Sequence, residues 1–342
     1  MEVDDAEEGF ALLLRLGVLT EAARVVAEVL CASRLDPGED AHREIVPGPA
    51  GQRRLQHYTR VVDAPGTQEL LAYPLVARGL TPDSTVIEVR GRRIGDGFFG
   101  LIAGPCTVET REQTLETARA VAAAGATVLR GGAFKPRSSP YAFQGLGSKG
   151  LEILAEAREE TGLPIVTELL DPRDVAEVAA IADVIQIGAR NMHNFNLLAE
   201  VGRVSNPVLL KRAPSATVEE LLMAAEYVAK EGNERVILCE RGIKTFERST
   251  RFTLDLSAVP VLKRETHLPV LVDPSHAAGR SDLVLPLARA AVAVGADGVM
   301  VEVHPQPEDA LCDGPQQIRV GEFARFADEI RTLVALMGKT VG

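Results

Sequence analysis

The sequence has few cysteines, no long apolar run and no excess of positive charge. Its four cysteines are widely spaced and form no Cys-x-x-Cys pair, so we expect no disulfide framework. Isolated cysteines of this kind are usually inert core residues, although one of them can serve as a metal ligand or nucleophile. They are Cys31, Cys106, Cys239 and Cys312.

The other two absences narrow the class of protein further. No apolar run approaches the ~18 residues that a membrane span needs, and residues 1–5 are acidic, unlike a signal peptide. The expected location is therefore the cytoplasm, with no membrane partner. The 37 basic and 48 acidic residues give a net charge of -11, which argues against general binding to nucleic acid. Any phosphate that the protein binds must be held locally.

The 342 residues, 46% hydrophobic and 25% charged, are typical of a globular protein with two domains or one large domain. Residues 1–80 predict a small N-terminal domain with a linker near residues 74–84. Its clearest element is a helix with Thr20 as the cap and an apolar stripe from Ala22 to Leu30. This segment carries no chemical motif, and we leave a regulatory role for it open.

Residues 81–342 have a repetitive organisation. Residues 86–89 and 93–94, separated by Gly91, predict a short β-hairpin. After it, apolar runs alternate with helical patterns about eight times, which is the size and rhythm of a (β/α)8 (TIM) barrel. A doubly wound open sheet is the alternative. The runs are 101–104, 127–129, 165–167, 184–187, 208–210, 236–239, 270–272 and 298–301, and the helical patterns include 112–124, 150–161, 174–180, 218–231 and 283–294.

Charged or metal-binding residues follow every predicted strand. The carboxyl ends of barrel strands are where catalytic groups lie, so we expect these side chains to converge on one mouth. In chain order they are Cys106; Arg130; Glu168; Arg190; Lys211 and Arg212; Glu240 and Arg241; Asp273 and His276; and Glu302 and His304.

The stretch 130–137 is the densest of these. An apolar run, 126–129, leads into Arg130, Lys135 and Arg137, which are set among two glycines and a proline. A solvated basic loop is the simpler interpretation of such a stretch taken alone. Its place in the repeat favours a buried strand that opens into an anion-binding loop.

The residues at the predicted mouth fall into two chemical groups. Six cations exceed what the nearby carboxylates can neutralise, and they suit two phosphorylated ligands, or one that also carries a carboxylate. A mixed sulfur, nitrogen and oxygen set suits a divalent transition metal, although Cys106 alone would be core filler and His276 alone a core histidine. The cations are Arg130, Lys135, Arg137, Arg190, Lys211 and Arg241, and the mixed set is Cys106, His276, Glu302 and Asp313.

Several segments together resemble a known family. In order and spacing they are similar to 3-deoxy-D-arabino-heptulosonate 7-phosphate (DAHP) synthase of the type I beta branch. The resemblance implies a metal-dependent (β/α)8 enzyme that condenses phosphoenolpyruvate with erythrose 4-phosphate, the first step of the shikimate pathway to aromatic amino acids. The segments are 102–106 (Ile-Ala-Gly-Pro-Cys), 130–137, 187–191 (Ile-Gly-Ala-Arg-Asn), 210–212 (Leu-Lys-Arg), 239–242 (Cys-Glu-Arg-Gly) and 272–276 (Val-Asp-Pro-Ser-His).

The same resemblance implies roles for single residues. The metal ligands would be Cys106, His276, Glu302 and Asp313, and the ion manganese, iron, cobalt or zinc. The phosphate of phosphoenolpyruvate would be held by Arg190, Lys211 and Arg241, and its carboxylate and reacting carbons would lie near Arg130 and Lys135. The phosphate of the aldose would be held by Arg137 and Ser138, where the family usually has Thr in place of Ser. The catalytic residues would be Lys135, His276 and Cys106, with Lys135 as proton donor because nearby cations lower the pKa of a lysine.

Two alternatives are kept. The related 3-deoxy-D-manno-octulosonate 8-phosphate synthase uses arabinose 5-phosphate, and its loop resembles Lys-Ala-Asn where this chain has Lys135-Pro136-Arg137. A non-catalytic barrel that serves as a binding module is the second, and stoichiometric metal would argue against it. The family expectation for assembly is a homo-oligomer, with a tetramer as the expected state.

Overall fold

The structure, a computed structural model, describes residues 72–79, 81, 83–137 and 139–342. The predicted N-terminal domain, with its helix at 20–30, lies outside the described residues, and so does Ser138. No helix in the described part of the chain is long and apolar enough to cross a membrane.

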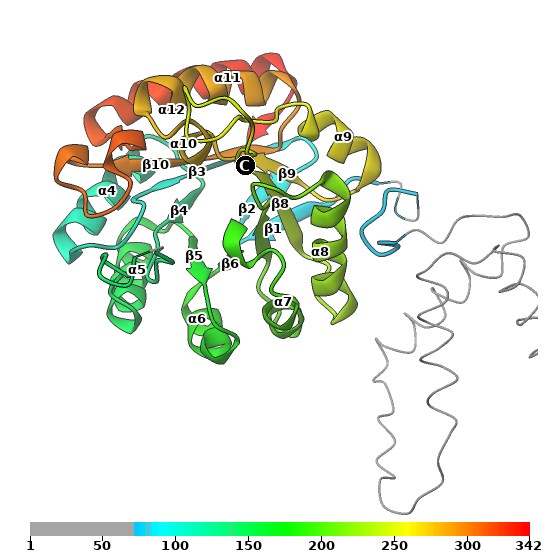
Figure 1. Cartoon of the computed structure of the whole chain (residues 1–342). Coiled ribbons are helices and arrows are strands. Elements are labelled where there is room, and N and C mark those ends of the chain that lie inside the picture. Colours follow the sequence, from blue (N-terminus) through cyan, green and yellow to red (C-terminus); the bar gives the residue numbers. More distant parts are fainter. Residues whose placement is uncertain (1–71, 80, 82, 138) are drawn as a thin grey trace, which may run out of the picture. The chain divides into compact units, whose positions relative to one another are not determined.

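Within those residues, eight parallel strands form a closed barrel (Figure 1). Each strand pairs with the next along the chain, and the last closes on the first, with Gly298 opposite Gly100 and Glu302 opposite Gly104. This closure confirms the predicted barrel and excludes the open sheet. The strands are β3 (Phe98–Gly104), β4 (Val128–Arg130), β5 (Ile165–Leu169), β6 (Val184–Ile187), β7 (Val208–Lys211), β8 (Val236–Glu240), β9 (Val270–Val272) and β10 (Gly298–His304).

Helices surround the strands (Figure 1). The five predicted helical patterns are all found, with ends that differ by one or two residues. The helices α7, α9, α10 and α12 were not among them. The first three have eight residues or fewer, which give little periodicity to recognise. The helices are α4 (Arg111–Ala123), α5 (Ser148–Thr161), α6 (Val175–Ile181), α7 (Phe195–Gly202), α8 (Val218–Lys230), α9 (Ala258–Glu265), α10 (Pro274–Ala278), α11 (Val284–Ala293) and α12 (Val320–Leu336). Two short strands, β11 (Ile318–Arg319) and β12 (Thr340–Val341), extend the sheet beside β10 and β3.

The predicted hairpin closes the amino end of the barrel. It consists of β1 (Val86–Val89) and β2 (Arg92–Gly95), and its turn has positive φ at Arg90 (46°) and Gly91 (78°). The buried side chains Ile87, Val89 and Ile94 belong to the same apolar cluster as residues from all eight strands. The barrel interior is therefore a filled core rather than a pore.

At the opposite end of the barrel, the carboxyl ends of the strands, the side chains that face the interior are polar. The inward residues Val128, Val166 and Leu209 belong to the interior cluster. Because side chains on one face recur every second residue, the next inward position of each strand lies one layer closer to the mouth. At that layer the sequence changes from apolar to polar, with Arg130, Glu168, Gln186, Lys211, Arg241, Asp273 and Glu302.

The chain enters the barrel along its outer surface. Glu226 on α8 accepts hydrogen bonds from the N–H groups of Leu75 (2.9 Å) and Val76 (3.1 Å). Ala77 pairs with Thr266, just after α9, in an isolated β-bridge, and Val76 is buried. This part of the predicted linker is therefore packed against the barrel.

Candidate active site

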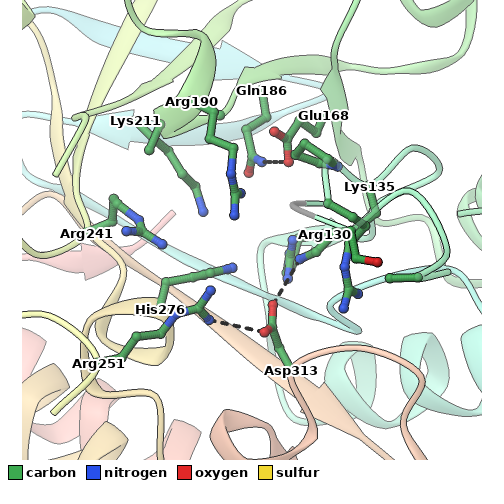
Figure 2. A pocket seen from close by; sticks show the side chains of 16 residues that line it. Arg130, Lys135, Glu168, Gln186, Arg190, Lys211, Arg241, Arg251, His276 and Asp313 are labelled. Carbon is green, nitrogen blue, oxygen red and sulfur yellow. Dashed lines mark hydrogen bonds and ion pairs between the residues drawn. The ribbon is translucent and has the colours of Figure 1, made fainter. Parts of the chain in front are cut away.

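A cavity of about 310 Å³ opens at the carboxyl ends of the strands (Figure 2). All six cations that the sequence places at the mouth line this cavity, together with His276 and Asp313. The complete lining is Arg130, Lys135, Pro136, Arg137, Ser139, Ala142, Glu168, Gln186, Gly188, Ala189, Arg190, Lys211, Arg241, Arg251, His276 and Asp313.

The lining is strongly cationic in a chain with a net charge of -11. Arg251 joins the six predicted cations, whereas the lining carboxylates are Glu168 and Asp313. Arg190, Lys211 and Arg241 point into the cavity from one side, and Arg130 and Lys135 from another (Figure 2). Such an arrangement favours an anionic ligand, because local cations raise the concentration of anions in a cleft.

Arg241 is the cation of the cavity that is best suited to bind an anionic ligand. Its side chain is buried at the end of β8, and no carboxylate of the described residues lies within ion-pair distance of it. Burial, with the nearby Arg251 and Arg190, lowers the pKa of Arg241 below its ordinary value. The guanidinium lies over Phe252, 4.5 Å from the ring centre, in a cation–π contact. A buried charge without a partner is costly, so a bound phosphate or carboxylate would relieve it.

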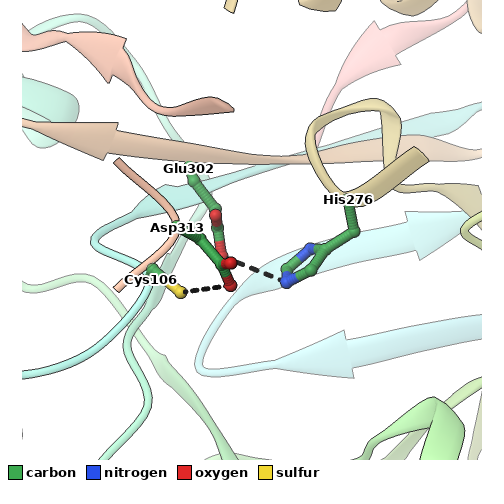
Figure 3. Close-up of side chains that lie close together, drawn as sticks. All are labelled: Cys106, His276, Glu302 and Asp313. Carbon is green, nitrogen blue, oxygen red and sulfur yellow. Dashed lines mark hydrogen bonds and ion pairs between the residues drawn. The ribbon is translucent and has the colours of Figure 1, made fainter. Parts of the chain in front are cut away.

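The four predicted metal ligands also meet beside this cavity (Figure 3). Their donor atoms all lie within 4.8 Å of one another. Two donors of one metal with bonds of 2.0–2.3 Å are separated by about 4.6 Å at most, so these side chains fit one ion after small adjustments. Cys106 comes from the loop after β3, His276 from α10, Glu302 from β10 and Asp313 from the loop after β10.

His276 owes its position to the helix in which it lies. Asp273 caps α10, since its Oδ1 accepts the N–H of His276 at 2.9 Å, and Pro274 occupies the first helical position. The same carboxylate accepts the Nδ1–H of His276 at 2.7 Å and the ammonium of Lys211 at 2.5 Å, both at Oδ2. Burial lowers the pKa of His276 to about 4, more than Asp273 and Glu302 raise it. The ring is therefore neutral, and the free lone pair on Nε2 faces Glu302 at 3.3 Å.

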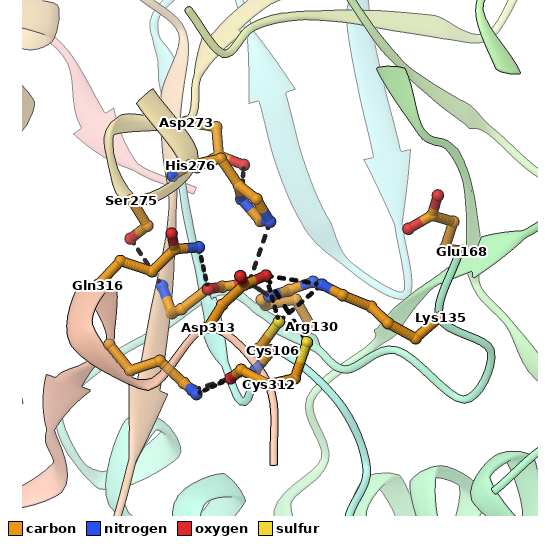
Figure 4. Close-up of polar contacts among 12 residues, drawn as sticks. Cys106, Arg130, Lys135, Glu168, Asp273, Ser275, His276, Cys312, Asp313 and Gln316 are labelled. Atoms are coloured by element: carbon orange, nitrogen blue, oxygen red, sulfur yellow. Dashed lines mark hydrogen bonds and ion pairs between the residues drawn. The ribbon is translucent and has the colours of Figure 1, made fainter. Parts of the chain in front are cut away.

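The two carboxylates of the metal set stay ionised. Burial would raise the pKa of Glu302, but His276, Arg130 and Lys135 together hold it at about 2. The pKa of Asp313 is also lowered, against burial, chiefly by Lys135. Arg130 pairs with Glu302, and Gln316 donates to the other oxygen of Glu302 at 2.6 Å (Figure 4).

Lys135 differs from the expectation in its pKa. Its Nζ lies 2.8 Å from Cys106 Sγ and 3.1 Å from Asp313 Oδ2 (Figure 4). Burial lowers its pKa, but Cys106 and the carboxylates of Glu302 and Asp313 raise it more, to well above the ordinary value. The expectation of a lowered pKa, based on neighbouring cations, was therefore wrong, because the metal ligands outweigh the cations in their effect on Lys135.

The last part of the cationic stretch contacts a second sulfur. Arg137 Nη1 lies 2.7 Å from Cys312 Sγ. A hydrogen bond from Cys106, with Lys135 and Arg137 nearby, lowers the pKa of Cys312 to about 7 despite partial burial. Arg137 lines the cavity near Ser139, whereas its predicted partner Ser138 is outside the described residues.

Six residues expected at the mouth do not line the cavity. Cys106 and Glu302 belong to the metal set beside it, Asp273 supports His276 and Lys211, and the other three face elsewhere. Arg212 and Glu240 point to the face of their strands opposite Lys211 and Arg241. They form a buried ion pair with each other at 2.9 Å, and Asp255 also pairs with Arg212. His304 lies at the end of β10 and faces Glu109 instead. Adjacent positions at a strand end point to opposite faces, which separates Arg212 from Lys211 and Glu240 from Arg241. Charge at a strand end therefore does not by itself predict which residue enters the mouth.

Gln186 and Arg251 are cavity residues that sequence reasoning missed. Gln186 donates to Glu168 at 3.1 Å, and its only sequence signal is that it interrupts the apolar run of β6. Arg251 donates to Asp313 at 3.1 Å from the long loop after β8, where strand rhythm gives no information. Gly188 makes room for Glu168, since a Cβ there would lie 1.9 Å from Glu168 Oε1.

Comparisons with known proteins agree with this geometry. The model of the DAHP synthetase I family matches residues 84–337. A phospho-2-dehydro-3-deoxyheptonate aldolase from Thermotoga maritima is 55% identical over 272 residues, which cover 80% of this chain and 80% of that protein. A 2-dehydro-3-deoxyphosphooctonate aldolase from Syntrophobacter fumaroxidans is 31% identical over 273 residues, covering 75% of this chain and 94% of that protein.

Solved structures give the same result. The crystal structure of the Thermotoga maritima aldolase (DAHP synthase) superposes with a TM-score of 0.77 at 53% identity, covering 81% of this chain and 80% of that one. A truncated form of 3-deoxy-D-arabino-heptulosonate 7-phosphate synthase from the same organism gives 0.75 at 51% identity, covering 79% of this chain and all (100%) of that one. A closed parallel barrel, a cationic mouth and these matches lead to one conclusion: the chain belongs to the DAHP synthetase I family of enzymes that form carbon–carbon bonds.

Proposed function

We propose that the protein condenses phosphoenolpyruvate with erythrose 4-phosphate to give 3-deoxy-D-arabino-heptulosonate 7-phosphate and phosphate. The observation that carries this proposal is the cavity itself, in which seven cations (Arg130, Lys135, Arg137, Arg190, Lys211, Arg241 and Arg251) lie next to a four-donor metal set. Two phosphorylated substrates, one of which also bears a carboxylate, account for that excess of positive charge.

The phosphate of phosphoenolpyruvate is assigned to Arg241, Arg190 and Lys211. Arg241 is buried with no carboxylate partner in the part of the chain that the structure describes, and Lys211 is held in place by Asp273. The carboxylate is assigned to Arg130 and Lys135, on the side of the cavity near the metal set. Arg137, with Ser138, is assigned to the phosphate of the aldose.

The metal set fits a divalent ion through its donor chemistry. A neutral imidazole, two ionised carboxylates and a thiol suit manganese, iron, cobalt or zinc. When bound, such an ion polarises an aldehyde carbonyl as a Lewis acid. Burial, followed by Cys312 and Glu302, raises the pKa of the Cys106 thiol, so binding through sulfur releases a proton.

The residues of the chain then orient the two substrates and handle protons. The cationic side chains hold the enol carbon of phosphoenolpyruvate next to the aldehyde carbon, and the bond between these carbons forms. The carbonyl oxygen takes a proton, for which Lys135 Nζ is the candidate, since it lies beside Cys106 and Asp313. Water adds to the cationic carbon that bears the phosphate, and phosphate leaves.

The test is phosphate release from phosphoenolpyruvate by the purified full-length protein, with erythrose 4-phosphate or arabinose 5-phosphate as acceptor, with and without EDTA. We expect release that requires erythrose 4-phosphate and is lost with EDTA. Release only with arabinose 5-phosphate would favour the octulosonate reaction, although the octulosonate relative is only 31% identical. No release with either acceptor would contradict catalysis and favour the binding module. Assembly as a homotetramer stays a prediction.

A further inference from the structure

A buried carboxylate near the metal ligands has no part in the chemistry above. Glu109 lies in the loop between β3 and α4, three residues after Cys106, and its side chain is 6% exposed. One of its oxygens, Oε1, accepts the N–H of Leu311 at 3.0 Å, and the other, Oε2, faces His304 Nε2 at 3.5 Å. Burial of a carboxylate is costly unless it is paired, so these contacts hold Glu109 at a defined place.

His304 is oriented from its other side. Its Nδ1 accepts the N–H of Gln306 at 3.1 Å, so the hydrogen of the neutral ring is on Nε2 and is directed to the side of Glu109. That Nε2 atom is buried and has no well-aligned hydrogen bond among the described residues. Glu109 is therefore the group that offsets its loss of water.

Both contacts act on the loop that carries Asp313. This loop runs from His304 to β11, and Asp313 adopts a left-handed backbone with φ 52°, which costs energy for a residue other than glycine. Gln317 anchors the side after Asp313, since it donates to the carbonyl of Cys312 at 2.9 Å and accepts the N–H of Cys106 at 3.2 Å. Glu109 and His304 anchor the side before Asp313, at Leu311 and Gln306.

We infer that Glu109, supported by His304, is a positioning residue for Asp313. It ties the Asp313 loop to the loop that supplies Cys106, so two metal ligands from separate loops keep one spacing. This inference rests on the proposed metal site. Groups that orient metal ligands typically contribute about 10–100-fold to metal affinity, and we expect an effect of that size here.

The experiment is a titration of the metal-free, full-length protein with Co²⁺, which reports on ligation independently of turnover. The thiolate-to-cobalt absorption follows Cys106, and the d–d bands follow the geometry of the whole ligand set. Glu109→Ala is expected to weaken Co²⁺ binding about 10–100-fold and to change the d–d bands while the thiolate absorption remains. Glu109→Gln keeps an acceptor for Leu311 N–H and is expected to lose less affinity than Glu109→Ala. Glu116→Ala removes an exposed carboxylate on α4 and is the matched control.

His304→Asn gives a second, independent measurement. Its side-chain oxygen can still accept the N–H of Gln306, but the group that faces Glu109 is lost, so weaker binding and altered d–d bands are expected again. If Glu109→Ala does not fold, Glu109→Gln and His304→Asn decide the question. Unchanged affinity and bands in the folded variants would overturn the inference, and so would an equal loss in Glu116→Ala. If the wild-type protein shows no Co²⁺ absorption that Cys106→Ser removes, the metal site itself is wrong and the inference fails with it.

Discussion

At the scale of single residues, the presence or absence of a carboxylate partner distinguishes structural arginines from arginines that are available to bind a ligand. Arg212, also buried, has two carboxylate partners, Glu240 and Asp255, whereas Arg241 has none within ion-pair distance among the described residues. Removing the partner of a paired buried charge destabilises the protein. A buried charge without a partner already destabilises the ligand-free protein. The two neighbouring strand ends therefore hold arginines of opposite kinds.

This contrast predicts the effect of Arg241→Met. We expect the KM for phosphoenolpyruvate to rise by the equivalent of about 2–5 kcal/mol, because a desolvated charge that meets the phosphate is lost. The free energy of unfolding of the ligand-free protein should stay unchanged or rise by about 1 kcal/mol. Steady-state kinetics and urea unfolding measure the two effects. Arg264→Met, on the exposed face of α9, is the control for the loss of a cation. Marked destabilisation with unchanged KM would show that Arg241 is structural.

At the scale of elements, the hairpin of β1 and β2 illustrates how a turn positions a core. Gly95 has φ 136°, and a Cβ there would lie 2.2 Å from the carbonyl oxygen of Thr85. Gly91, in the turn itself, also has positive φ (78°), but nothing lies within 4 Å of a Cβ built on it. The hairpin thus contains one glycine required by backbone conformation and another required by close contact as well.

The two glycines give a matched pair of substitutions. Gly91→Ala should lower the free energy of unfolding by about 1 kcal/mol, the cost of a positive φ for alanine. Gly95→Ala should lower it by about 3 kcal/mol or more, because the backbone must also move away from Thr85 and disturb Ile87 and Ile94 in the interior. Urea unfolding of the two variants tests this order. Equal losses would show that close contact at Gly95 contributes nothing.

The sequence predicts the barrel and most of the site because both follow from periodicity. The eight strands and the cations at their ends were recognisable from apolar runs followed by charge. The sequence did not show which side chains at the strand ends face the barrel interior. Arg212 and Glu240 were therefore placed at the mouth, although they pair on the other face. Arg251 and the Glu109–His304 contact depend on loops whose course the sequence pattern does not determine. The pKa of Lys135 depends on which charges lie nearest, and that also needed the structure.

At the scale of the molecule, charge is segregated. The chain has a net charge of -11, yet seven of the residues that line the cavity are cations. Two anionic substrates are repelled by the average surface and attracted by the mouth, so association should weaken as salt increases. The barrel unit begins at Tyr73, and residues 73–79 are packed on its outside.

This packing predicts how the chain tolerates truncation. Removal of residues 1–72 should leave kcat/KM within roughly threefold of the full-length value, since every residue that lines the cavity or belongs to the metal set lies in the barrel unit. Any change should concern regulation or assembly, measured by effector titration and by sedimentation.

Removal of residues 1–83 is the informative comparison. It deletes Val76 from the core and leaves Glu226, whose pKa is raised by burial, without the two N–H groups that it accepts. We expect this shorter variant to unfold at a lower urea concentration than the variant that begins at residue 73. Equal stability of the two truncated variants would show that residues 73–79 contribute nothing to the free energy of unfolding. Loss of folding in the variant that begins at residue 73 would show that residues 1–72 are structural.

The alternation of side chains at the ends of β7 and β8 has a consequence for insertions and deletions. Lys211 and Arg241 face the cavity, and their neighbours Arg212 and Glu240 face away. Shifts of one residue in opposite directions in the two strands would exchange the two pairs and replace two cations of the mouth by a neutral pair, while the apolar runs changed little in composition. The register of the strands thus decides which charged side chains face the cavity of this barrel, and one-residue slips could remove those charges from an otherwise intact fold.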